Sequence, residues 1–410
     1  INKLNLNNII ELINKNKGKY NLEFYLIGGA VRDLLMGTHP TDLDFNFIEQ
    51  QTSVQQFIKE VFKPKKINSS QFNTYKFSYN SFNIDFAMCR KEKYKNPAIL
   101  PDISEGNLLE DQQRRDFSIN SIAIKTDDFS QNIFIDPFNG VNDIKEKQIK
   151  NIHSNSFSDD PTRIFRAIRY SHRLNFQIFS STLNEIAIFK DNITNLSGIR
   201  VKNEIIKILE EDKIIDILLE CEKFKLLKHL NMHLILPPYL PYWMETKIND
   251  RNSIFKKQQL LRDKILLFLS TFLCNSSNEY IHKTSKELGF EKSITNYWVN
   301  IVRIKKDLDK FDFTNGKNSK LNAILNKSTE SICLGLTQWY KESESNKIFN
   351  YWNKIRHIKP KLNSNDLFSI GITEGPLLGE IKKALEIYVI DNPNTRKAQQ
   401  KKFVTKLLNS

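Results

Sequence analysis

The sequence predicts an α+β multidomain protein, with an N-terminal head built on a mixed β-sheet and an all-helical remainder. Three observations support this fold class. Between residues 24 and 135, short apolar runs alternate with turn residues, whereas after residue 160 apolar residues recur with the 3.6-residue helical period. The length of 410 residues suffices for two to three domains. We expect the head at residues 1–145, a helical neck at 146–235 and a helical body and tail at 236–410.

The expected sheet begins with FYLIGGA, a buried strand that ends in two glycines and leads into the short helical pattern AVRDLLM. DLDFNFI alternates at period two, as a half-exposed strand does. YKFSYN and FNIDFAMC are two further strands, separated by the turn-prone pair Asn80-Ser81. SINSIAIK is either a strand or a short helix. The charged segment from Arg90 to Ser104 is expected to be a loop.

Four amphipathic patterns after Asp160 predict helices: RIFRAIRYSHRLNF, STLNEIAIFKDNI, RVKNEIIKILEE and KIIDILLECEKFKLLKHL. The pair Pro237-Pro238, followed by Pro241, interrupts the chain. Further helical segments continue to the C-terminus, with weak breaks at residues 275–278 and 315–318.

Composition points to a polyanionic partner, because 61 Lys and Arg exceed 47 Asp and Glu and give a net charge of +14. Nucleic acid and an anionic membrane surface both satisfy this charge. No apolar run approaches the roughly 18 residues of a membrane span, and Lys and Asn interrupt the N-terminal stretch before a signal sequence forms. Four scattered cysteines fit a reducing compartment, so we expect a cytoplasmic protein without a membrane partner. The abundance of Lys, Asn and Ile offers compositional drift as a second source of the charge.

The first chemical motif combines the Gly28-Gly29 turn and Arg32 with a pair of aspartates. A strand that runs into two glycines and a short helix lets the backbone approach a phosphate, which Arg32 could then clamp. Asp42 and Asp44 lie two apart on an expected strand, so both carboxylates point to one face. Adjacent carboxylates repel each other unless a cation lies between them, and hard oxygen ligands favour Mg²⁺. The alternative is a solvated strand face.

Two further motifs combine arginines with aspartates. Arg114 and Arg115 precede a β-rich segment and could bind phosphates or ribose; a surface ion pair between Arg115 and Asp116 is the alternative. The second motif opens a helix, with Asp160 as the N-cap and a proline after it. Three arginines recur every three residues on the side of Asp160, namely Arg163, Arg166 and Arg169. A solvated helix face is again the alternative.

Together these motifs resemble class II tRNA nucleotidyltransferases, the family of bacterial and eukaryotic CCA-adding enzymes and bacterial poly(A) polymerases. The segments that carry the resemblance, in the family's order over about residues 24–210, are LIGGAVRDLLMG with DLDF, RRDFSINSIA, DPFNGVNDI, DDPTRIFRAIRY and LSGIRVKNEIIKIL. The resemblance implies a polymerase-β-like nucleotidyltransferase head. The C-terminal half resembles the family's tRNA-binding helical body and tail more loosely.

The resemblance also implies roles for single residues. Asp42 and Asp44 would hold catalytic Mg²⁺, and Asp85 is a candidate third carboxylate. Residues implied to contact the triphosphate, ribose or phosphate region are Gly29, Arg32, Arg115 and Asp116. Asp160 and Arg163 would read the incoming base. Arg166 and Arg169 would support that helix or reach the nucleotide, and the turn 136–140 would be a hinge between head and neck. The family's last motif, which braces the helix, is matched by Gly198, Ile199, Arg200 and Glu204.

The implied reaction is attack of a tRNA 3′-hydroxyl on the α-phosphorus of CTP or ATP. Cytosine and adenine both present an exocyclic amine beside a bare ring nitrogen. A carboxylate at Asp160 can accept from the amine and the guanidinium of Arg163 can donate to the nitrogen, whereas guanine and uracil would leave these charges unpaired. CC addition, A addition and poly(A) synthesis stay open, as does an inactive RNA-binding protein of the same fold. The sequence indicates no oligomeric state.

Lysine and arginine clusters of the helical part are candidate contacts to the tRNA backbone. They are Lys256-Lys257, Lys305-Lys306, Lys359 with Lys361, and Arg396-Lys397 with Lys401-Lys402. Each cluster taken alone is also explained as a solvated helix face.

Overall fold

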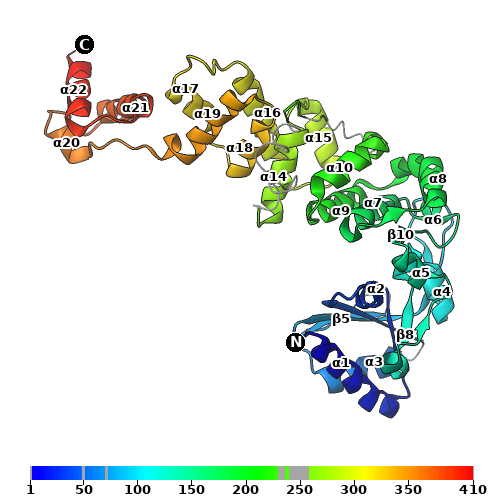
Figure 1. Cartoon of the computed structure of the whole chain (residues 1–410). Coiled ribbons are helices and arrows are strands. Elements are labelled where there is room, and N and C mark those ends of the chain that lie inside the picture. The colour runs from blue at the N-terminus through cyan, green and yellow to red at the C-terminus, as the bar shows by residue number, and fades with distance from the viewer. Residues whose placement is uncertain are drawn as a thin grey trace. The chain divides into compact units, whose positions relative to one another are not determined.

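The computed structural model describes residues 2–48, 51–69, 73–229, 235, 237–239 and 258–409. The chain forms two compact units, Ile1–Glu204 with Asp216–Leu230 and Ile205–Ile215 with Asn231–Ser410. The first unit contains the sheet, and the second is helical (Figure 1). The predicted α+β class is therefore confirmed. The finer boundaries at 145 and 235 stay predictions.

The head is built on a seven-stranded mixed sheet. Its strand order is β3 (Asn68–Ser69), β4 (Thr74–Tyr79), β5 (Phe82–Met88), β2 (Asp42–Phe47), β1 (Tyr25–Ile27), β8 (Ala123–Lys125) and β9 (Phe134–Ile135). The β2–β5 pair is parallel and the other neighbouring pairs are antiparallel. The four strands expected from the sequence are confirmed, including the turn at Asn80, whose φ is 54°.

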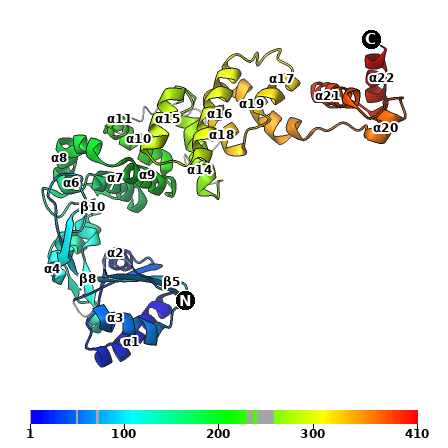
Figure 2. The same ribbon diagram turned by 180° about the vertical axis from the view of Figure 1, so that it is seen from behind.

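The two faces of the sheet differ in chemistry because side chains alternate along each strand. One face is apolar: the rings of Phe45 and Phe86 are fully buried and stacked, with centroids 5.2 Å apart. Helices α1 (Asn2–Lys17) and α3 (Gln51–Phe57) cover this side, and α2 (Gly29–Leu35) lies on the opposite side (Figures 1 and 2). The opposite face carries the aspartates.

Two segments differ in detail from the sequence expectation. The segment predicted as a loop contains an antiparallel ribbon of β6 (Arg90–Lys93) and β7 (Asp102–Glu105). Charged and apolar residues do not alternate in β6, because all four of its residues are charged, and sequence patterns therefore do not reveal this strand. The segment SINSIAIK, for which a strand and a short helix were both expected as alternatives, contains both: a 3₁₀ turn at Ser118–Asn120 is followed by β8.

The segments predicted as helical after residue 160 are confirmed. In the first unit the helices before and after this point are α4 (Leu108–Gln113), α5 (Gly140–Lys145), α6 (Ser156–Asp159), α7 (Thr162–Leu174), α8 (Ser180–Phe189), α10 (Ile214–Lys223) and α11 (Leu226–His229). Helix α9 (Gly198–Leu209) passes from the first unit into the second. A short parallel pair, β10 (Gln148–Ile149) and β11 (Gln177–Ile178), flanks α7.

The second unit contains α14 (Leu261–Phe272), α15 (Asn278–Glu287), α16 (Lys292–Asp309), α17 (Asn318–Leu325), α18 (Glu330–Thr337), α19 (Glu342–Asn353), α20 (Ser364–Phe368), α21 (Pro376–Asp391) and α22 (Lys397–Leu408). The predicted breaks at 275–278 and 315–318 fall between helices, as expected. The fully buried indole of Trp298 donates to the Leu273 carbonyl at 3.1 Å. Among the helices of the described residues, none has the length and apolarity that a bilayer crossing requires.

Gly140 lies where α5 packs tightly against the 3₁₀ turn at Ser118–Asn120. Asp136 accepts from the amides of Gly140 and Val141 at 2.7 and 2.8 Å, which fixes the start of α5. A Cβ at Gly140 would lie 2.2 Å from the carbonyl oxygen of Ser118, a contact that only a backbone shift can relieve.

We expect Gly140→Ala to lower the free energy of unfolding by about 1–3 kcal/mol, because an added methyl group overpacks this contact. Gly18→Ala is the control, since a Cβ there meets nothing within 4 Å, and should change stability by less than about 0.5 kcal/mol. Urea titration measures both. Equal stability of the two variants would show that α5 is not in this contact.

Candidate active site

A row of polar side chains crosses the neighbouring strands β2, β5 and β4, on the face of the sheet opposite Phe45 and Phe86. Asp42 and Asp44 share this face of β2. Strand register places Asp44 opposite Asp85 on β5, and Asp85 opposite Lys76 on β4. Lys76 forms an ion pair with Asp85, and the Asn83 amide donates to Asp42 at 2.9 Å. The predicted shared face is thus present, and Asp85 lies where a third carboxylate would, although a lysine neutralises it.

The electrostatics at Asp44 favour a cation. Burial raises the pKa of Asp44 above its ordinary value, and the carboxylates of Asp85 and Asp42 add to this rise, while the opposing effect of Arg115 is smaller than that of burial. A cation beside the carboxylates would relieve this repulsion. Among the described residues, no cluster of three or more histidine, cysteine or acidic side chains forms a ready-made metal cage. A pair of carboxylates is nevertheless the donor set that Mg²⁺ uses when a bound nucleotide supplies further oxygens.

The glycine turn next to this row makes room for an arginine. Gly28 precedes α2 with φ of 79°, a conformation that L side chains rarely adopt. A Cβ on Gly28 would lie 2.9 Å from Arg115 Nη1 and 3.9 Å from Asp44 Oδ2. The guanidinium of Arg115 therefore rests over the turn and beside the carboxylates. Sequence reasoning singled out Gly29, where a Cβ would make only ordinary contact with Arg32 at 3.5 Å.

Arg32 and Asp116 are linked through Asn120, which sequence reasoning missed. Arg32 is 6% exposed, donates from Nη1 to Asn120 Oδ1 at 2.6 Å, and pairs with Asp33 at 2.7 Å. Asn120 donates in turn to Asp116 Oδ1 at 3.1 Å, and Arg166 pairs with Asp116 Oδ2 at 2.6 Å. Burial acts to raise the pKa of Asp116, but Arg166 and Asn120 outweigh it and hold that pKa below its ordinary value. Both oxygens of Asp116 are thus occupied by protein donors.

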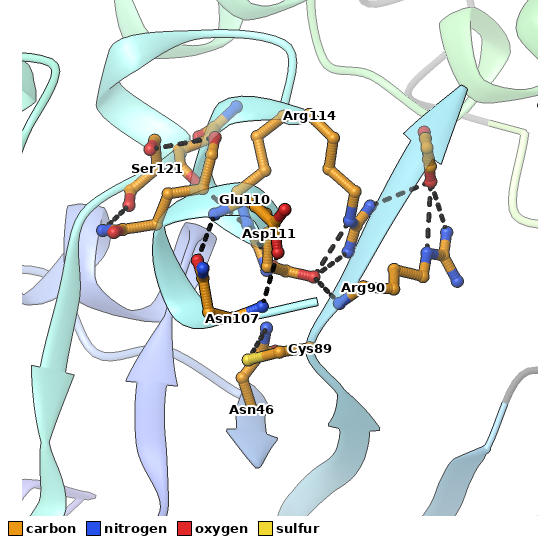
Figure 3. Close-up of polar contacts among 12 residues, drawn as sticks. Asn46, Cys89, Arg90, Asn107, Glu110, Asp111, Arg114 and Ser121 are labelled. Carbon is orange, nitrogen blue, oxygen red and sulfur yellow. Dashed lines mark hydrogen bonds and ion pairs between the residues drawn. The ribbon is translucent and has the colours of Figure 1, made fainter. Parts of the chain in front are cut away.

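Asp111, a second residue that sequence reasoning missed, binds both arginines of the RRD motif. Figure 3 shows Asp111 with Arg114 and Arg90. The side chain of Asp111 is fully buried. One oxygen accepts from Arg114 at 2.6 and 2.9 Å and from the amide of Arg90 at 3.3 Å. The other accepts from Arg115 at 3.0 and 3.2 Å. The available sequence signal was the spacing, since Asp111 lies three and four residues before the arginines, and a capping box at Asn107 marks the helix that carries it.

Asp160 lies just before α7, and its two carboxylate oxygens have different surroundings. The helix begins at Thr162, so the predicted N-cap lies two residues before it, because Pro161 already has a helical backbone. Asp160 still caps the helix, since its Oδ1 accepts from Thr162 N at 3.0 Å and from Thr162 Oγ1 at 2.6 Å. Arg200 pairs with the same oxygen at 2.6 Å and donates to the Ala98 carbonyl at 2.8 Å. Oδ2 accepts no hydrogen bond from the residues that the structure describes.

Two arginines of α7 are buried, since Arg163 and Arg169 are only 6% and 5% exposed. Arg163 donates to Ser156 Oγ at 2.7 Å and to the carbonyl of Arg114 at 2.6 Å. Each terminal nitrogen keeps one further N–H, so the guanidinium is held in place with donors to spare. Arg169 lies 3.7 Å from Glu204, which joins α7 to α9. Four guanidiniums lie 5.3–5.7 Å from the ring of Tyr170, those of Arg32, Arg166, Arg169 and Arg173.

These contacts form one connected network within the first unit. From Asp44 it passes to the adjacent Arg115, then through Asp111 to Arg114, whose carbonyl accepts from Arg163. The sequence-predicted residues of the three motifs are therefore brought together. Their individual roles toward a ligand stay predictions.

The basic clusters of the second unit differ among themselves. Lys305 is buried and pairs with Asp309 at 2.6 Å, with its ammonium 5.2 Å from the ring of Trp339, so it does not present a free charge to a partner. Lys306 is exposed. The remaining described residues of these clusters are exposed as well: Lys359, Lys361, Arg396, Lys397, Lys401 and Lys402. Lys256 and Lys257 lie outside the described residues.

Comparison with known proteins gives matches along the whole chain. Residues 24–150 match the family "Poly A polymerase head domain", and residues 175–235 match "Probable RNA and SrmB- binding site of polymerase A". A solved structure, "The structure of CCA-adding enzyme apo form II", is similar with a TM-score of 0.83 and 25% identity over 99% of this chain and 96% of that one.

Two curated relatives show different extents of similarity. The A-adding tRNA nucleotidyltransferase of Geobacter sulfurreducens is 33% identical over 220 residues, which is 53% of this chain and 25% of the relative. The CCA-adding enzyme of Staphylococcus epidermidis is 24% identical over 400 residues, which is 92% of this chain and 91% of the relative. The matched part of this chain thus spans a quarter of the first relative's length and nearly all of the second's.

We expect Asp111→Asn to lower the free energy of unfolding at pH 7 by about 3–5 kcal/mol, because it removes the ion pair of the partly buried Arg115 and leaves Arg114 with Glu92 as its remaining carboxylate partner. Burial opposes ionisation of Asp111, but Arg115 and Arg114 hold its pKa below the ordinary value. The native carboxylate therefore stabilises the fold above the unfolded-state pKa, and this contribution is lost as pH falls through the native pKa.

The measurement is denaturant unfolding of wild type and variant from pH 7 downward, and the stability gap should narrow below about pH 4. Asp102→Asn is the matched control. Asp102 pairs with Lys95 at the surface, where its side chain is 63% exposed, so its loss should cost less than about 1 kcal/mol. If Asp111→Asn lowered the free energy of unfolding no more than Asp102→Asn does, the stabilising role of Asp111 in the network would be contradicted.

Proposed function

We propose that this chain, which is similar to CCA-adding enzymes and bacterial poly(A) polymerases, adds C or A nucleotides to the 3′ end of tRNA. The observation that carries the proposal is the alignment of two carboxylates, Asp42 and Asp44, beside Arg115, within one network that reaches Asp160 and Arg163. Similarity to the CCA-adding enzyme of S. epidermidis over 92% of this chain supports the same conclusion.

The proposed reaction forms a bond between the RNA 3′-oxygen and the α-phosphorus of CTP or ATP. The bond from that phosphorus to the bridging oxygen breaks, pyrophosphate leaves, and the hydroxyl proton is lost to solvent. Asp42 and Asp44 would hold Mg²⁺, which supplies a lowered hydroxyl pKa and charge neutralisation at the triphosphate. Arg115, held over Gly28, adds fixed positive charge where negative charge develops. No covalent intermediate is needed.

Asp116 and Arg32 take different parts in the proposed site. The carboxylate of Asp116 has both oxygens bonded within the protein, so it acts on Arg166 and Asn120 rather than on ribose directly. Through Asn120 it also fixes the guanidinium of Arg32 behind the glycine turn. Arg32 therefore contributes its charge to the triphosphate from a buried and fixed position, where desolvated charge acts more strongly than it does in water.

Base choice without a template follows from the pair Asp160 and Arg163. Asp160 Oδ1 is saturated by Thr162 and Arg200, which orients Oδ2 to accept from the amine of cytosine or adenine. Arg163 is held by Ser156 and has N–H donors left for the ring nitrogen. Guanine and uracil present a carbonyl to the carboxylate and would leave charged groups unpaired.

The family contains several end products, and one experiment separates them. tRNAs lacking the last three, two or one nucleotides are each offered CTP or ATP alone with Mg²⁺. Addition of C to the tRNAs that lack three or two nucleotides, together with addition of A to the tRNA that lacks one, identifies CCA addition. C alone or A alone identifies the partial enzymes, and long A tails on unrelated RNA identify a poly(A) polymerase. Absence of all incorporation would contradict the proposal and support an inactive RNA-binding protein. A cytoplasmic location stays a prediction from the sequence.

We expect Asp42→Ala to reduce Mg²⁺-dependent incorporation to below about a hundredth of the wild-type rate, since electrostatic groups at the reacting centre contribute at least that much. Single-turnover addition of one nucleotide measures the rate. Asp102→Ala, which removes an exposed carboxylate of the same domain, is the control and should keep the wild-type rate. An Asp42→Ala variant with a tenth of that rate would exclude the assigned role.

We expect Asp160→Ala to change nucleotide choice more than the rate of chemistry. The ratio of C or A addition to G or U addition should fall roughly tenfold or more, since a hydrogen bond to a charged group is worth about 1.5–3 kcal/mol. Incorporation with each of the four nucleotides, at fixed tRNA, gives this ratio. Unchanged selectivity together with a large loss of rate would assign Asp160 to catalysis or folding instead.

A further inference from the structure

An open cleft of about 770 Å³ lies on the open face of the sheet, next to the catalytic carboxylates but outside the network described above. One end is lined by Asp42, Asp44 and Asp85, and the cleft extends over β4 and β5 to the segment that follows residue 62. Its basic lining residues are Lys63, Lys65, Lys66 and Lys76. Arg32 and Arg115 do not line it.

Strand order places this cleft and the glycine turn on opposite sides of the carboxylates. Strand β2 pairs with β1 on one side and with β5 on the other. In register, Asp44 lies between Ile27, the last residue before the glycine turn, and Asp85 at the cleft. The carboxylates therefore lie between two basic surfaces, one formed by Arg115 over Gly28 and one formed by the lysines of the cleft.

Three of the four lysines that line the cleft have no ion-pair partner among the described residues. Lys76 pairs with Asp85. Lys63, Lys65 and Lys66 are exposed and form no ion pair with the described part of the chain. The lining also contains neutral hydrogen-bonding groups: the amides of Asn68, Asn80 and Asn83 and the hydroxyls of Ser78 and Tyr79. The lysines suit the phosphates of a nucleic acid, and the amides and hydroxyls suit its ribose or base groups.

We propose that this cleft binds the last nucleotides of the acceptor RNA, with their phosphates at Lys63, Lys65 and Lys66 and the terminal 3′-hydroxyl at Asp42 and Asp44. This inference rests on the proposed function, because nucleotidyl transfer brings two polyanions to one pair of carboxylates. Repulsion between the two substrates requires compensating charge on both sides. The arginine side serves the triphosphate, which assigns the lysine side to the RNA.

Lys65→Ala/Lys66→Ala tests the assignment, with Lys15→Ala/Lys59→Ala as the matched control. All four lysines are exposed head residues, and the control pair does not line the cleft. The cleft variant should raise the KM for tRNA about tenfold, leave the KM for CTP or ATP within twofold, and keep kcat at saturating tRNA. The slope of log KM for tRNA against log salt concentration should fall by about 1.4, for two lost contacts to a single strand.

An unchanged KM for tRNA, or the same effect in the control, would overturn the proposal. A selective rise in the KM for the nucleotide would show that the lysines bind the triphosphate instead of the RNA, and this result would also overturn the proposal.

Photo-crosslinking separates this proposal from the proposed function, because it needs no turnover. A tRNA that lacks CCA and carries 4-thiouridine at its 3′ end is irradiated with the full chain in EDTA. Crosslinks mapped by mass spectrometry to residues 62–69 or 73–83 support the cleft, and crosslinks confined to other segments contradict it. If wild type crosslinks in the cleft but adds no nucleotide, the proposed activity fails and the binding site stands.

Discussion

A single buried carboxylate, Asp111, sets the geometry on which the rest of the site depends. It is fully buried between two guanidiniums, and each of its oxygens takes two hydrogen bonds from one arginine. One arginine lies over Gly28 beside Asp44, while the carbonyl of the other anchors Arg163 on α7. The carboxylates of β2 and helix α7 are therefore both in contact with one pair of adjacent arginines. A charge without partners would be costly here, so the arrangement persists only when all members are present.

The sheet supplies the second constraint, which is the register of its strands. The β2–β5 register aligns Asp44 with Asp85, and the β4–β5 register adds Lys76 to the same row. A slip of one residue would move these groups to the apolar face and expose rings such as Phe45 and Phe86. Burial of those rings thus stabilises the fold and also holds the carboxylates at the surface where two substrates can meet.

Sequence alone predicted the parts of this arrangement that depend on local spacing. The alternation of DLDF places Asp42 and Asp44 on one face, and helical periodicity groups the arginines of α7. It could not predict contacts across long separations, such as Arg200 with Ala98 or Arg32 with Asn120, because no local pattern encodes a partner about a hundred residues away. Gly29 was chosen over Gly28 for a similar reason, since only the three-dimensional approach of Arg115 shows which glycine is constrained.

The most direct test is the rate of single-nucleotide addition by Asp111→Asn, measured in denaturant-free buffer where circular dichroism shows the variant folded. The buried Asp111 carboxylate accepts from Arg90, Arg114 and Arg115, so a role confined to stability would leave kcat unchanged in the folded fraction. We expect kcat to fall at least tenfold, with Asp102→Asn at the wild-type value. A folded Asp111→Asn variant that adds C or A at the wild-type rate would contradict the central role of this carboxylate.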